Sequence, residues 1–136
     1  MILEVFTDGA YSSLRDQGGI GIVILKDNKK IFEYSNTYKH TTNNQMELGA
    51  VILALCVIKS KYESIIIYSD SQYVIGCATK GWKRKKNIKL WQEFNKQYSR
   101  VKELCSNLVF KHVKGHNGNK WNEYCDKIAV KASQLI

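Results

Sequence analysis

Four carboxylate residues stand at places where a folded chain could bring them together. Asp8 follows a strand-forming start to the chain, and Asp70 ends a short apolar run. Glu47 lies one turn into a long apolar segment, and Asp126 lies in the closing segment. Carboxylates that are crowded together repel one another unless cations neutralise them, and divalent cations prefer such oxygen ligands. Two ions about 4 Å apart can hydrolyse a phosphodiester by generating hydroxide and stabilising both the attacking and the leaving oxygen.

A single acid at any of these positions is more often a helix cap or a solvated surface group than a metal ligand. Whether the four form one site depends on the elements that position them. Hydropathy and turn signals predict strands over 2–7, 18–25, 31–38, 64–69 and 108–113, and helices over 43–58, 71–78, 88–104 and 120–135. Thr42 or Asn43 is expected to cap the first of these helices, and Asp70 and Ser71 the second.

This order of elements predicts one domain over residues 1–136, of the α/β (α+β layered) class, with a mixed five-stranded sheet flanked by helices. The continuous apolar run within 64–69 predicts a central strand that is covered on both faces. If the first and fourth strands are neighbours, Asp8 and Asp70 emerge at the same edge of the sheet. Glu47 and Asp126 would then reach that edge from two helices.

The amino-acid composition indicates which class of partner the protein binds. The 136 residues include 21 Lys and Arg against 12 Asp and Glu, a net charge of +9, and 44% of the residues are hydrophobic. A folded domain with that excess of positive charge favours a polyanion, nucleic acid first and an anionic membrane a distant second. No apolar run is long enough to span a bilayer. The four cysteines are isolated and no secretory signal is present, which indicates free thiols, a reducing intracellular setting and a cytoplasmic protein.

Four segments in series carry a resemblance to a known family. They are Thr7-Asp8-Gly9-Ala10, Thr41-Thr42-Asn43-Asn44-Gln45-Met46-Glu47-Leu48, Ser69-Asp70-Ser71-Gln72-Tyr73-Val74, and Val113-Lys114-Gly115-His116-Asn117-Gly118 continuing through Asn122 to Asp126. Together they resemble the successive motifs of the type 1 ribonuclease H (RNase HI-like) family, from Thr7 to about Ala132. One motif alone would mean little, but four in the right order are specific.

The resemblance implies a ribonuclease H-like fold and an endonuclease that hydrolyses the RNA strand of RNA/DNA hybrids, leaving 5′-phosphate and 3′-hydroxyl ends. It implies two Mg²⁺ ions, for which Mn²⁺ can substitute. Asp8 would bridge both ions, Glu47 and Asp70 would hold the ion on the leaving-group side, and Asp126 the ion that activates water. His116, between two glycines, would assist proton transfer or product release. The expected protein is a monomer.

Recognition of the hybrid requires contacts to the 2′-hydroxyl and to the backbone. Amide and hydroxyl side chains cluster beside the acidic residues, and the expected contacts are Thr42, Asn43, Asn44, Gln45 and Gln72. The run 80–89 contains no acid and combines aromatic with basic side chains. We expect Trp82, Lys83, Arg84, Lys85 and Lys86 to contact the hybrid, whereas Trp91 is either part of that aromatic wall or part of the core.

The chain departs from the family in one major respect and leaves two rival interpretations. Many family members carry an extra basic helix before the position of Trp82, and this chain is too short there to hold one. The run 80–89 is expected to replace it in part. The first rival is a DNA nuclease of the same fold, resolvase-like or transposase-like. The second is a nucleic-acid-binding module that has lost catalysis.

Overall fold

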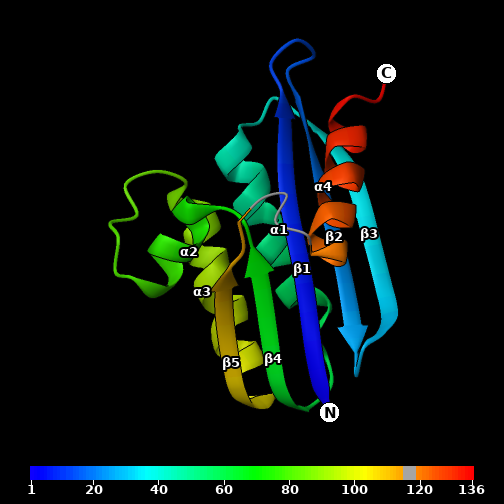
Figure 1. Cartoon of the computed structure of the whole chain (residues 1–136). Coiled ribbons are helices and arrows are strands. Elements are labelled where there is room, and N and C mark those ends of the chain that lie inside the picture. The colour runs from blue at the N-terminus through cyan, green and yellow to red at the C-terminus, as the bar shows by residue number, and fades with distance from the viewer. Residues whose placement is uncertain (115–118) are drawn as a thin grey trace.

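The computed structural model describes residues 1–114 and 119–136 (Figure 1). Its elements, in chain order, are β1 (Ile2–Ser12), β2 (Gln17–Lys26), β3 (Lys29–Lys39), α1 (Asn43–Val57), β4 (Tyr62–Ser69), α2 (Gln72–Thr79), α3 (Ile88–Lys102), β5 (Cys105–His112) and α4 (Lys120–Ser133). In the described part of the chain, no helix is both long and apolar enough to cross a membrane.

The strands form one mixed sheet in the order β3-β2-β1-β4-β5. β1, β2 and β3 pair antiparallel through two tight connections, whereas β4 runs parallel to β1, and β5 runs parallel to β4. The parallel pairings need helical crossovers, which α1 and the α2–α3 segment supply. The predicted mixed five-stranded sheet is therefore confirmed, with the first and fourth strands as neighbours.

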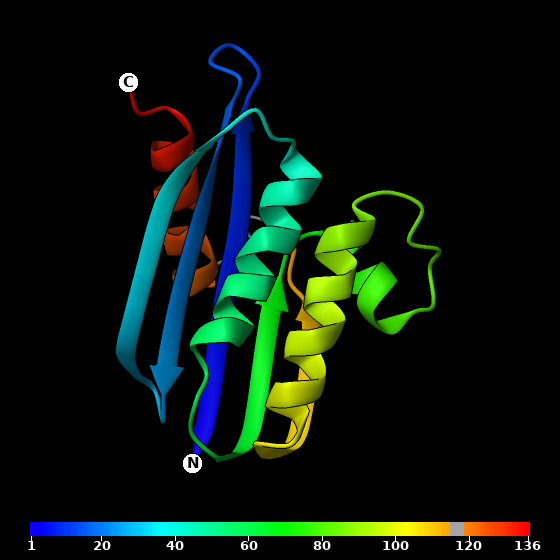
Figure 2. The same cartoon turned by 180° about the vertical axis from the view of Figure 1, so that it is seen from behind.

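Helices cover the two faces of the sheet unequally. α1 and α3 lie side by side on one face (Figure 2), and α4 lies on the other face over β1, β2 and β3 (Figure 1). The main core fills the first interface, where Leu48, Val51 and Leu55 of α1 meet apolar side chains of the central strands. A smaller cluster beneath α4 joins Phe6, Val23, Leu25 and Cys125.

Three expectations about the strands differ from the structure. β1 continues to Ser12 because its second half pairs with the glycine-rich start of β2, so Asp8 lies within the strand and not after it. β5 begins at Cys105, earlier than predicted. The prediction that the fourth strand is covered on both faces is wrong. Ile65 and Ile67 are buried, whereas the alternate side chains Ile66 and Tyr68 are only half-buried because α4 does not extend over β4.

Candidate metal centre

Three carboxylates from three elements meet at one edge of the sheet. One oxygen from each of Asp8, Glu47 and Asp70 lies within 4.8 Å of the other two. The pairing of β1 with β4 accounts for two of them: Phe6 lies opposite Tyr68, and each aspartate follows its partner residue at the same offset. Asp8 and Glu47 are buried, with 3% and 6% of their surface exposed, and Asp70 is half-buried.

A close approach between α1 and β1 delivers the third carboxylate. A Cβ added at Gly9 would lie 2.4 Å from the backbone nitrogen of Glu47, so any larger residue would push the helix away from the strand. The Gly9 amide donates to Glu47 Oε1 at 2.6 Å and to Asp8 Oδ1 at 2.9 Å. One backbone N–H thus links two of the three acids and fixes their relative position.

Asp126 reaches the same edge from the opposite face of the sheet. A Cβ at Gly21 would lie 2.5 Å from the carbonyl oxygen of Cys125, so α4 packs directly on the backbone of β2. The Cys125 thiol donates to the carbonyl of Phe6 at 3.3 Å, which ties the helix to β1. Asp126, the next residue, lies near enough to raise the pKa of Asp8 through its charge and a side-chain hydrogen bond. It stands beside the group of three carboxylates and is not one of them.

Burial and mutual repulsion make the ionised acids costly. Loss of hydration raises the pKa of Asp8 above its ordinary value, and the charges of Asp70 and Asp126 raise it further. The pKa of Glu47 is raised by burial first and then by the charges of Asp8 and Asp70. A cation that binds between these groups would favour their ionised forms and so reverse both shifts.

One oxygen of Asp70 is a buried polar atom that lacks a partner. Among the described residues, Asp70 Oδ1 is the buried side-chain oxygen or nitrogen without a hydrogen bond. Leaving a buried acceptor unsatisfied costs about 1–3 kcal/mol, and more for a charged group. A hard divalent cation takes carboxylate oxygens as ligands. The converging carboxylates and the unpartnered oxygen of Asp70 therefore fit a bound divalent cation.

Sequence reasoning missed one residue at this edge. His112 ends β5 and pairs with Ser69, and its ring Nε2 lies 3.2 Å from the carbonyl oxygen of Asp70. The signal available in the sequence was its place at the end of a strand parallel to the one that ends before Asp70. His116 lies outside the described residues.

The polar residues at the start of α1 divide into two groups. Thr42 caps the helix, as predicted, by accepting from the Gln45 amide at 3.1 Å, and Asn43 and Asn44 are exposed beside it. The Gln45 side chain is engaged within the protein, since its Nε2 donates to Asn87 Oδ1 at 3.3 Å. Gln72 is exposed at the start of α2, where Ser71 and not Asp70 is the N-cap.

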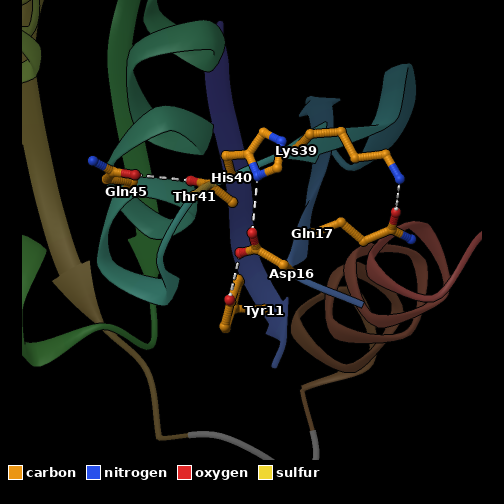
Figure 3. A network of polar contacts seen from close by, with 7 residues as sticks. All are labelled: Tyr11, Asp16, Gln17, Lys39, His40, Thr41 and Gln45. Atoms are coloured by element: carbon orange, nitrogen blue, oxygen red, sulfur yellow. Dashed lines mark hydrogen bonds and ion pairs between the residues drawn. The ribbon is translucent and has the colours of Figure 1, made fainter. Parts of the chain in front are cut away.

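The segment that leads into α1 is tied to the turn between β1 and β2 (Figure 3). Asp16 Oδ2 lies 2.9 Å from the ring Nδ1 of His40, and Asp16 Oδ1 accepts from the Tyr11 hydroxyl at 2.7 Å. The backbone N–H of His40 also donates to the Asp16 carbonyl. Thr41, which precedes the helix, donates at 3.0 Å to Oε1 of Gln45 in its first turn. These contacts join the start of α1, the helix that carries Glu47, to the turn between β1 and β2.

The basic run forms a loop between α2 and α3. Lys83, Lys85 and Lys86 are exposed, and Trp82 is 47% exposed. Trp91 is 2% exposed and belongs to the core, which resolves the alternative left open for it. Residues 80–87 contain no helix, as expected for a chain without the extra basic helix.

The chain is similar in sequence to proteins of one known family. The family model for RNase H matches residues 2–134. Ribonuclease H of Trichodesmium erythraeum is 42% identical over 144 residues, covering 98% of this chain and 90% of that protein. Ribonuclease HI of Synechocystis sp. is 37% identical over 141 residues, covering 97% and 88%.

The fold agrees with this. The crystal structure of RNase H1 from the halophilic archaeon Halobacterium salinarum matches with a TM-score of 0.76 at 24% identity, covering 97% of both chains. The family model and the two relatives each extend over nearly the whole chain, and the structural match independently supports the sheet order described above. The chain therefore belongs to the RNase H family.

Proposed function

We propose that this protein is an endonuclease that hydrolyses the RNA strand of RNA/DNA hybrids, leaving 5′-phosphate and 3′-hydroxyl ends. Membership of the RNase H family supports the substrate class. The observation that carries the chemistry is the meeting of Asp8, Glu47 and Asp70, with one oxygen of each within 4.8 Å of the other two, while Asp70 Oδ1 has no hydrogen-bond partner among the described residues. Divalent cations are the partner that three crowded carboxylates require.

Each acid has a role in this proposal. Asp8, at the centre, would contact both ions, with Glu47 and Asp70 on the leaving-group side and Asp126 on the side of the attacking water. Two bound Mg²⁺ ions, or Mn²⁺ in their place, would supply an activated water and neutralise the leaving oxygen. The Gly9 amide holds Asp8 and Glu47 in register for this task. His116 would assist proton transfer or product release.

The hybrid would be bound by two surfaces. The exposed side chains of Asn43, Asn44 and Gln72 stand beside the acidic edge and could donate to and accept from the 2′-hydroxyl that marks the RNA strand. Thr42 lies at the N-terminus of α1, where free backbone N–H groups favour a phosphate. Gln45 is engaged with Asn87 and would act by fixing this surface.

The second surface is the loop 80–87. Among its exposed lysines, Lys83, Lys85 and Lys86 would neutralise backbone phosphates, and the half-exposed Trp82 would pack against a sugar or base. The net charge of +9 supports a polyanionic partner. We further propose that residues 1–136 act as one catalytic domain, that the protein is a cytoplasmic monomer, and that it needs no membrane.

A panel of labelled duplexes tests this function. RNA/DNA, RNA/RNA and DNA/DNA duplexes of one sequence are incubated with the protein in Mg²⁺ and in EDTA, beside the Asp70→Asn variant. The expected result is cleavage of the RNA strand in the hybrid alone, in Mg²⁺ alone, and by the unaltered protein alone. Cleavage of the DNA duplex would indicate a DNA nuclease, and binding of the hybrid without cleavage would indicate an inactive binding module. Either outcome would overturn the proposal.

A further inference from the structure

Arg84 stands among exposed lysines, but its side chain is turned into the protein. Its Nε and Nη2 donate to the carbonyl of Cys77 at 3.3 and 3.2 Å, and its Nη1 donates to Asn95 Oδ1 at 2.6 Å. The guanidinium also lies over the Trp91 ring, 4.2 Å from its centroid. Two opposite sides of the guanidinium fork are thus engaged by α2 and α3, and one face of its plane is covered by an aromatic ring. Arg84 joins the two helices between which the loop runs.

The loop alternates residues that hold it with residues that point away. Trp82 packs on Gly76 of α2, where an added Cβ would lie 2.1 Å from the indole ring. Asn87, at the other end, donates to the Tyr73 hydroxyl at 3.0 Å and takes the left-handed conformation, with φ of 59°. Arg84 lies between these two anchors. Lys83, Lys85 and Lys86, which lie between these anchors, are exposed.

A second arginine, far from the loop, also donates to backbone carbonyls at the end of a helix. Arg100 on α3 donates through Nη2 to the Leu55 carbonyl at 2.7 Å and through Nη1 to the Ile58 carbonyl at 2.8 Å, at the C-terminal end of α1. A cation that satisfies the last carbonyls of a helix stabilises that helix end. Arg84 does the same for α2. Only Arg84, however, belongs to the segment that carries the exposed lysines.

We propose that Arg84 is a positioning residue for hybrid binding: it holds the 80–87 loop against α2 and α3, so that Lys83, Lys85 and Lys86 face the nucleic acid together. This replaces the expectation that Arg84 itself contacts the hybrid, and it rests on the proposed function. A short loop fixed at three points can present its lysines as a group with little loss of conformational freedom on binding. That is how a chain without the extra basic helix can keep a basic surface.

The chemistry of the site requires arginine. A lysine at this position would keep the positive charge but could not donate in two directions from one planar group or stack on Trp91 in the same way. If Arg84 contacted a phosphate directly, Lys would retain much of the affinity, because a phosphate accepts either cation. The Arg84→Lys variant therefore separates the two roles.

The experiment measures binding and turnover separately. Binding of a labelled RNA/DNA hybrid is followed by fluorescence anisotropy in EDTA, where cleavage cannot occur, over a range of KCl concentrations. Steady-state cleavage in Mg²⁺ then gives kcat and KM. The variants are Arg84→Lys, Asn95→Ala, which removes one Arg84 partner without changing charge, and Lys86→Gln. Arg100→Lys is the matched control, since it loosens the end of α1 by removing the same kind of arginine–carbonyl contact, away from the loop.

Arg84→Lys is expected to raise Kd and KM on the order of tenfold with kcat unchanged, and to lower the slope of log K against log salt by more than the ~0.9 that one phosphate contact contributes. Lys86→Gln should lower the slope by about 0.9. Asn95→Ala should shift Kd in the same direction as Arg84→Lys, by a smaller factor. Arg100→Lys should lower Tm and leave Kd, KM and the salt slope unchanged.

Three results would overturn the proposal: an Arg84→Lys variant that binds like the unaltered protein, an Arg84→Lys variant that lowers kcat with KM unchanged, or an Arg100→Lys variant that weakens binding as much as Arg84→Lys. The proposed function fails separately. An unaltered protein that binds the hybrid in EDTA but does not cut it in Mg²⁺ would refute the nuclease activity, and the anisotropy comparison of Arg84 with Arg100 would still stand.

Discussion

The acidic edge and the basic loop differ in how their charged side chains are placed and in how well water solvates them. The acids come from elements far apart in the sequence, and Asp8 and Glu47 are buried where their charges are costly. The lysines of the loop are contiguous and exposed, so each keeps its hydration. The fold must therefore force the acids together, through backbone contacts at Gly9 and Gly21, whereas the lysines need only be held in place. A substitution at the acidic edge should therefore reduce cleavage strongly, whereas a substitution of one loop lysine should reduce hybrid binding only slightly.

The largest effect is expected at the acidic edge. Asp70→Asn keeps the shape of the side chain but removes the charge and one anionic oxygen from the group of three. We expect the rate of hybrid cleavage to fall about 10³-fold, since a bound divalent cation contributes ~4 kcal/mol to transition-state stabilisation. Tm in EDTA should stay the same or rise, because one repelling charge is gone. A variant with normal cleavage in single-turnover assays would contradict the assignment.

Close packing at Gly9 gives the next effect. Gly9→Ala places a methyl group 2.4 Å from the backbone of α1. Overpacking of this kind costs about 1–3 kcal/mol, and the helix shift should also move Glu47 and slow cleavage. Gly81→Ala in the loop is the comparison: it meets open space but must keep a φ of +71°. That should cost about 1 kcal/mol, with kcat retained. Urea unfolding measures the loss of stability in each variant, and steady-state cleavage measures its kcat. Equal losses of kcat would contradict the comparison.

The stability of the metal-free protein should depend on pH through the acidic edge. The pKa values of Asp8 and Glu47 are raised in the folded state, so the folded protein binds more protons than the unfolded chain once pH exceeds the ordinary carboxyl values near 4. Stability in EDTA should therefore be greatest below that pH and should decline as pH rises toward and past neutrality. Mg²⁺ should reduce the decline by neutralising the same groups.

Thermal unfolding at pH 5 and pH 8, with EDTA or with Mg²⁺, measures this dependence. Glu47→Gln is the matched variant and should flatten the decline in EDTA. A Tm in EDTA that rises between these two pH values, or a Glu47→Gln variant with the same decline as the unaltered protein, would show that the acids do not control it.

The smallest effect is expected from single lysines. Lys85→Gln removes one exposed charge and no packing. Binding of the hybrid should weaken about threefold to tenfold near physiological salt, with the loss shrinking as KCl is raised. Anisotropy titrations at two salt concentrations suffice, with Lys61→Gln, on the connection between α1 and β4, as a control of equal charge. A loss that is the same at both salt concentrations would argue against a phosphate contact.

Much of this arrangement could be predicted from the sequence, and the failures have specific causes. Periodicity and turn signals predict the strands and helices, and Asp8 and Asp70 are expected to share an edge if the first and fourth strands are neighbours, which the structure shows. The run Ile65-Ile66-Ile67 could not show that only one face of β4 is covered, because an apolar run looks the same in both cases. The end of β1 was misplaced because Gly9 and Ala10 interrupt its alternation, while pairing with β2 carries the strand onward.

The inward contacts of Arg84 could not be predicted in this way. Its partners are a carbonyl at Cys77, the side chain of Asn95 and the face of Trp91, which come from two different helices. A basic residue within a basic run gives no local sign that it points inward. Only the packing of α2 against α3 places those acceptors together.

Binding of Mn²⁺, followed by electron paramagnetic resonance in the absence of nucleic acid, tests the central claim most directly. The unaltered protein should bind Mn²⁺ saturably. Asp70→Asn should weaken that binding at least tenfold, about 1.4 kcal/mol. Asp27→Asn, on the turn between β2 and β3 where the carboxylate accepts from the Ile2 amide, should bind as the unaltered protein does. Equal Mn²⁺ affinity in the unaltered protein and in Asp70→Asn would show that Asp8, Glu47 and Asp70 do not form the ion site.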